Sequence, residues 1–212
     1  VTDYIAQLMF KSPPGFTDAM DLAKMAAMLR MIAPLEDDQF HIWRQTRTGL
    51  LSYPLEISAA RAHLSASIYL QMALRPHIVH IVGHTEADHA ATAEDVIEAA
   101  RMARRAIENA LRGAPDLLAD PAVQARIEVL QHEAGLILAA IRTLAQTGAD
   151  PLTDPQVLAL AVQKGILDAP QLRNNPFAPG RVRTTILNGA CVTVDEKGQA
   201  VAEEKRLQSL NL

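Results

Sequence analysis

The chain has 212 residues, 49% of them apolar, so it is long enough to fill one hydrophobic core and to carry a smaller appendage. Twenty basic and twenty-four acidic residues give a net charge of −4, which argues against nucleic acid as a partner because no basic stripe is available to neutralise phosphates. The single cysteine, Cys191, excludes an internal disulfide and favours a reducing compartment such as the cytoplasm.

The first half of the chain alternates strand patterns with helix patterns. The predicted strands are the short apolar segment 4–10, the alternating segment 40–49 and the β-branched segment 78–83. Because the last of these is apolar except for His80, it is typical of a strand buried on both faces. Helices are predicted between and after the strands, over residues 18–33, 57–74 and 92–111. Thr92 and Asp95 have the spacing of a capping box at the start of the third helix.

The second half is predicted to be mainly helical. Asp120-Pro121 and Asp154-Pro155 are start signals for helices over residues 121–145 and 155–164. Asn188-Gly189 predicts a hairpin turn between strands 181–187 and 191–195. A charged terminal helix is expected from residue 203.

Strands joined by helices favour parallel pairing through right-handed crossovers, and therefore an α/β fold. Three strands do not close a barrel, which takes eight. We therefore expect either an open sheet or a partial TIM barrel over residues 1–113, followed by a helical extension with a terminal β-hairpin over residues 114–212. The chain begins at Val1 without a secretion signal and enters a strand almost at once, which suggests a start inside a domain. No apolar run reaches the roughly 18 residues of a membrane helix, so no membrane partner is expected.

The second predicted strand carries an unusually polar group, Arg44, Gln45 and Arg47. A guanidinium grips a carboxylate or phosphate through paired hydrogen bonds, and an unpaired buried arginine is costly. This group is therefore predicted to contact a ligand or a partner. The alternative is an ion pair with the acidic turn at residues 36–38 or with Glu56.

The densest ionisable group lies in and around the third predicted strand, and comprises His77, His80, His84, Glu86, Asp88 and His89. In parallel sheets and barrels, the loop after the carboxyl end of a strand is where ligands bind. Imidazole and carboxylate also suit zinc or iron, but the spacing matches no helical metal motif cleanly, so no metal site is assigned. The alternative is that His77 and Glu86 are solvated or hydrogen-bonded locally and that His80 is a paired core histidine.

Several segments resemble the large (α) subunits of the D-lysine 5,6-aminomutase family, and more distantly those of ornithine 4,5-aminomutase. They are residues 43–54, 69–74, 77–97, 167–170 and 188–191. The resemblance covers most of this chain, but only the later portion of such a subunit.

The resemblance implies a TIM barrel whose mouth faces adenosylcobalamin and holds pyridoxal 5'-phosphate. It implies an isomerase that moves the terminal amino group of a lysine-like amino acid by a radical 1,2-shift. A cobalamin-binding β-type subunit carrying the Schiff-base lysine is the implied partner. The sequence agrees with a partner that binds cobalamin and supplies the Schiff-base lysine. The chain has no Asp-x-His-x-x-Gly cobalamin motif and no lysine in a predicted buried strand.

On this interpretation the cofactor-binding mouth is lined by Arg44, Gln45, Arg47, His80, His84, Glu86, Asp88 and His89. Two alternatives remain open. One is a metal-dependent hydrolase on a similar barrel that uses His80, His84 and His89. The other is a non-catalytic subunit that completes the barrel of another protein.

Overall fold

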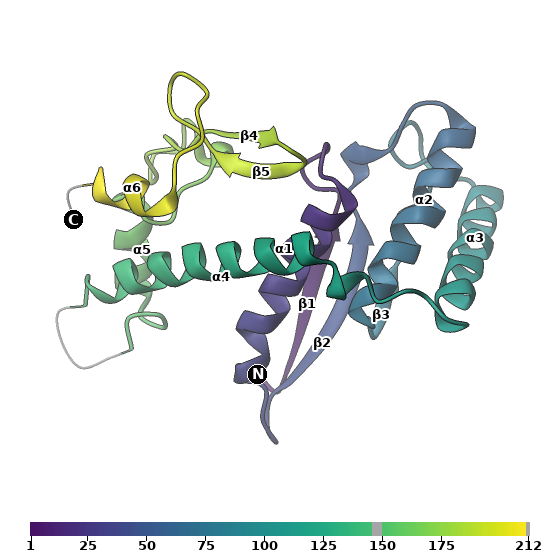
Figure 1. Ribbon diagram of the computed structural model, residues 1–212, viewed down its shortest axis with the longest axis horizontal. Helices are drawn as coiled ribbons and strands as arrows, with labels where there is room; N and C mark the ends of the chain where they lie inside the picture. Colours follow the sequence, from purple (N-terminus) through teal and green to yellow (C-terminus); the bar gives the residue numbers. More distant parts are fainter. Residues whose placement is uncertain (146–149, 211–212) are drawn as a thin grey trace. The chain divides into compact units, whose positions relative to one another are not determined.

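The computed structural model of the chain describes residues 1–145 and 150–210 (Figure 1). The chain forms two compact units, Val1–Glu128 and Val129–Leu212. The division falls inside helix α4 (Pro121–Arg142), on the C-terminal side of the boundary expected after residue 113. Each unit is described by itself below. Within the described residues, none of the helices is both long enough and apolar enough to cross a membrane.

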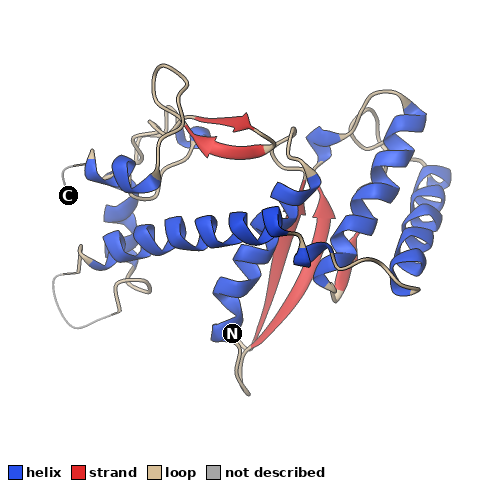
Figure 2. Cartoon of the chain, viewed as in Figure 1, coloured by secondary structure: helices blue, strands red, loops and turns tan. Residues whose placement is uncertain are grey.

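The first unit is built on a parallel three-stranded sheet (Figure 2). Its strands are β1 (Asp3–Phe10), β2 (His41–Thr48) and β3 (Ile78–His80), in the order β1-β2-β3. They alternate with the helices α1 (Asp18–Ile32), α2 (Ile57–Gln71) and α3 (Ala93–Leu111). The predicted strand–helix alternation and the mixed α/β class are confirmed.

Within the first unit, helices cover one face of this sheet. Its buried residues alternate along β1 and β2, and they are Ala6, Leu8, Phe10, Ile42, Thr46 and Thr48. Helix α1 contacts β1 and helix α2 contacts β2. On the other face, Ile5 is 51% exposed, Trp43 41% and Ile78 39%. We call this second surface, formed by the odd-numbered residues of β1 and β2 with Ile78 and His80, the open face.

The third strand differs from its prediction. It was expected to run over residues 78–83 and to be buried on both faces, but it ends at His80, and Ile78 and His80 are exposed. The apolar pattern is misleading here because β3 is an edge strand and one face of the sheet is uncovered. The buried apolar residue Val82 belongs instead to the connection that packs with Leu64 and Ile68 of α2 and with Ala103 of α3.

Local side-chain contacts explain why the helices begin where they do. The Thr92 hydroxyl accepts a hydrogen bond from the Asp95 backbone, and Asp95 reaches back to the Thr92 backbone, so the predicted capping box is present. Glu56 accepts hydrogen bonds from two backbone N–H groups at the start of α2. These contacts satisfy donors that an uncapped helix would leave without partners.

The second unit combines the later part of α4 with α5 (Pro155–Gln163), a hairpin and α6 (Glu203–Gln208). Its core is formed around Ile141, Ala161 and Ile166. The hairpin strands β4 (Thr184–Leu187) and β5 (Ala190–Thr193) pair antiparallel. Asn188 and Gly189 both have positive φ, as a tight hairpin turn requires, so the predicted hairpin is confirmed.

Candidate functional site

The open face carries a polar group towards the carboxyl ends of the strands. In the register of the sheet, Gln7 lies beside Gln45, and Arg47 lies beside both Met9 and His80. The Gln45 side-chain amide donates to the Gln7 Oε1 atom at 3.1 Å. Three of the predicted site residues, Gln45, Arg47 and His80, are therefore brought together on one surface.

Arg47 carries a buried polar atom without a partner on this face. Its Nε atom is buried and has no hydrogen-bond partner among the described residues. A buried donor of a charged group that lacks a partner costs free energy, and an anionic ligand would remove that cost. The position can therefore bind a carboxylate or a phosphate, with the Gln45 amide and the His80 imidazole as neighbouring hydrogen-bonding groups.

Arg44 lies apart from this group, on the helix-covered side of β2. Its Nε and Nη2 atoms donate to the Arg75 carbonyl at 3.1 and 2.9 Å, and Nη2 lies 3.2 Å from His77 Nε2. The sequence offered residues 36–38 or Glu56 as ion-pair partners of Arg44. No ion pair joins Arg44 to any of these residues. We therefore leave Arg44 out of the proposed site.

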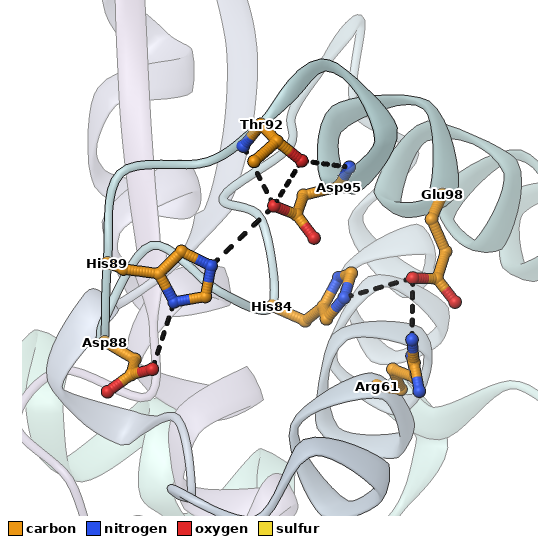
Figure 3. A network of polar contacts seen from close by, with 7 residues as sticks. All are labelled: Arg61, His84, Asp88, His89, Thr92, Asp95 and Glu98. Atoms are coloured by element: carbon orange, nitrogen blue, oxygen red, sulfur yellow. Dashed lines mark hydrogen bonds and ion pairs between the residues drawn. The ribbon is translucent and has the colours of Figure 1, made fainter.

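The connection between β3 and α3 holds the remaining predicted residues, and His84, Asp88 and His89 belong to two polar networks (Figure 3). In the first network, the buried His84 ring places Nε2 3.3 Å from a Glu98 carboxylate oxygen on α3. The same carboxylate pairs with Arg61 of α2 at 2.9 Å, and this bond lowers the pKa of Glu98. His84 therefore faces Glu98, but neither of its buried ring nitrogens makes a hydrogen bond among the described residues.

The second network is exposed and centred on His89. Its Nδ1 atom lies 3.0 Å from Asp88 Oδ2, and its Nε2 atom lies 3.7 Å from Asp95 Oδ2 (Figure 3). The Asp88 contact raises the pKa of His89, because a carboxylate favours the protonated ring. Glu86 is also exposed, and its Oε1 atom accepts from the Gly83 backbone at 2.5 Å. These carboxylates give the connection an acidic surface that suits a cationic group.

The structure adds two residues that the sequence reasoning missed. Gln7 is identified only by its register with Gln45, across two different strands. Tyr53, in the connection after β2, donates its hydroxyl hydrogen to the Val82 carbonyl at 2.7 Å. Burial raises the pKa of Tyr53 to about 12, so the hydroxyl stays protonated and joins the connections that follow β2 and β3. No local sequence signal points to either residue.

Metal binding was a possible alternative for the histidine–acid group. In the described ranges, 1–145 and 150–210, no group of three or more His, Cys, Asp and Glu side chains is arranged to hold a metal ion. His80 lies on the open face, whereas His84 and His89 belong to the two separate networks of the connection. Their distribution among separate contacts gives the metal-dependent hydrolase no support.

The fold and the site define a mixed α/β protein with a one-sided parallel sheet and a polar group on its open face. Comparison with known proteins finds no family model that matches the chain, and no significant match among curated proteins.

Proposed function

We propose that the first unit is a segment of a TIM-type barrel, and that its open face forms part of the chamber wall of an adenosylcobalamin- and pyridoxal-phosphate-dependent aminomutase. The reaction would be a radical 1,2-amino shift on a lysine-like amino acid in the cytoplasm. The observation that carries the proposal is the buried, unpartnered Arg47 Nε beside Gln45 and His80 on the open face.

The arrangement of the sheet supports the barrel part of this proposal. Consecutive parallel strands lie side by side in chain order, and helices cover one face only. In a barrel the helices form an outer ring and the inward face of the strands is closed by the other strands. The exposed apolar side chains of Ile5, Trp43 and Ile78 fit a surface that further polypeptide covers.

The residues present fit part of a pyridoxal phosphate site. Arg47 supplies a cationic donor for a phosphate or carboxylate, with Gln45 and His80 beside it. The three strands contain no lysine, and Lys11 and Lys24 are both paired with aspartates. The first unit therefore offers no free lysine for a Schiff base, and the proposal assigns that lysine to a cobalamin-binding β-type partner subunit.

When bound, pyridoxal phosphate and adenosylcobalamin would supply the radical chemistry, and this chain would bind and orient. Arg47 holds an anionic group, and Gln45 and His80 hydrogen-bond polar atoms beside it. The acidic connection carrying Glu86 and Asp88 gives a favourable electrostatic environment to an ammonium group of the substrate. His84 lies 3.3 Å from Glu98 and would act as a positioning residue for that connection when its ring is protonated.

The proposal is tested by calorimetric titration of the full chain with pyridoxine 5'-phosphate, which lacks the aldehyde and so cannot react with surface lysines. Pyridoxine, which lacks the phosphate, is the matched control ligand. We expect saturable binding of the phosphate ester and binding of pyridoxine weaker by at least about tenfold, the value of one charge-assisted hydrogen bond. Equal binding of the two ligands, or no binding of either, would count against the proposal.

A further inference from the structure

A second candidate site lies on the covered side of the sheet, near the amino ends of β2 and β3. It is a cleft of about 1020 Å³ within the first unit. Its lining is mainly apolar and includes Leu29, Ile32, Leu74, Leu111, Leu117 and Leu118. The volume is near the upper end of the range for small-molecule sites. Charged residues also line the cleft, and they are Arg30, Glu36, Arg44, Arg75 and Asp116.

The charged groups at this cleft are not equally satisfied. Glu36 accepts from the Ile42 backbone and Asp116 accepts from the Leu118 backbone, both at 3.1 Å. Arg30 donates to Gln124 at 2.8 Å. Arg75, by contrast, is exposed, and its guanidinium makes no hydrogen bond or ion pair to any residue in the described part of the chain. None of the three lining arginines is paired with a carboxylate among residues 1–145 and 150–210. The lining therefore presents one cation without a partner.

The backbone at Arg75 is held in an uncommon conformation. Its φ of 47° and ψ of 59° are left-handed, a region that costs free energy for residues other than glycine. The Arg44 guanidinium holds the Arg75 carbonyl through two hydrogen bonds, and Arg44 itself lines the cleft. The side chain of Arg44 thus fixes the turn from which the Arg75 side chain leaves the backbone.

We propose that this cleft binds a small amphipathic anion, a carboxylate with a hydrocarbon body, whose charge pairs with Arg75 and whose apolar part lies among the leucines. The assignment follows from charge complementarity, since Arg75 is the lining cation without a protein partner. The site is separate from the open face, because its lining includes Arg44, on the covered side of β2, and none of Gln45, Arg47 and His80.

The proposal is tested with the full chain by calorimetric titration of octanoate, with 1-octanol as the uncharged control ligand. We expect octanoate to bind at least about tenfold more tightly than octanol, and Arg75→Gln to weaken octanoate binding by a similar factor. Arg112→Gln removes a nearby arginine that does not line the cleft, and is expected to leave binding unchanged. Ala110→Trp fills the cleft and is expected to abolish binding of both ligands.

Far-UV circular dichroism checks that the Ala110→Trp variant folds. If that variant does not fold, Ala114→Trp replaces it, because Ala114 lines the cleft from a loop. The proposal is overturned if the folded wild type does not bind octanoate, or if Arg75→Gln binds it as tightly as the wild type. It is also overturned if the wild type is a dimer by light scattering that Ala110→Trp converts to a monomer, because a second copy would then occupy the cleft.

Discussion

Arg44 and Arg47 lie on opposite faces of β2, although only two residues separate them in the sequence. Arg44 donates to the Arg75 carbonyl on the covered side, and Arg47 lies beside His80 on the open face. Side chains alternate along a strand, so residues three positions apart point in opposite directions. The two arginines therefore do not grip one ligand together.

The Arg44 contacts predict a structural role for that residue. Arg44→Ala removes two hydrogen bonds to the Arg75 carbonyl, and we expect it to lower the free energy of unfolding by about 1–2 kcal/mol. Urea unfolding measures the difference. Arg75→Gln keeps the carbonyl and is the matched control, with an expected change within about 0.5 kcal/mol. Equal stability of Arg44→Ala and the wild type would remove this role.

The Tyr53 hydroxyl predicts a second effect on stability. Tyr53→Phe leaves the buried Val82 carbonyl without its donor, and we expect a loss of about 1–3 kcal/mol. Tyr69→Phe is the control, because its hydroxyl makes no hydrogen bond within the described residues. Ultraviolet titration of the wild type should show one tyrosine with a pKa near 12, and Tyr53→Phe should remove it. A titration that Tyr53→Phe leaves unchanged would contradict the burial of this hydroxyl.

The capping box of α3 gives a prediction read directly from the sequence. Thr92→Ala removes the side chain that accepts from Asp95, and is expected to cost about 1 kcal/mol in chemical unfolding. Thr92→Ser keeps the hydroxyl and should retain most of the stability. If serine and alanine have the same effect, the cap does not stabilise α3.

His89 gives a prediction for pH dependence. Its pKa is raised in the folded chain, chiefly by Asp88, so the protonated ring is the form that folding favours. Its contribution to stability is therefore fully present below the unfolded pKa of about 6.5, and it is lost as the pH rises through the folded pKa. Comparison of His89→Gln with the wild type across this range should show a difference that disappears at high pH.

Nuclear magnetic resonance gives the direct measurement for the same residue. The His89 ring should titrate above 6.5 in the wild type and closer to 6.5 in Asp88→Asn. A wild-type value at or below 6.5 would show that the Asp88 contact does not form.

Local signals in the sequence predicted much of the fold. The Thr92–Asp95 spacing, the Asp154-Pro155 start and the Asn188-Gly189 turn all lie where the structure has them, because each acts over a few residues. Alternation along residues 40–49 correctly predicted a strand there. It does not tell which face the helices cover, because that depends on the packing of distant elements.

The candidate site depended more on contacts between distant parts of the chain. The Gln7–Gln45 pair, the His84–Glu98 contact and the Arg44–Arg75 contact join residues on different elements. A single sequence carries no local signal for such pairs. For the same reason, the apolar run after Ile78 suggested a doubly buried strand, whereas the structure has an edge strand that ends at His80.

The most direct test of the open face as a ligand surface compares pyridoxine 5'-phosphate binding by Arg47→Gln and by Arg105→Gln. Arg105 is an exposed arginine of α3, so its replacement controls for the change in net charge. We predict that Arg47→Gln weakens binding by at least about tenfold and that Arg105→Gln leaves it unchanged. Equal dissociation constants for the wild type and Arg47→Gln would contradict the assignment of the open face as the anion-binding wall.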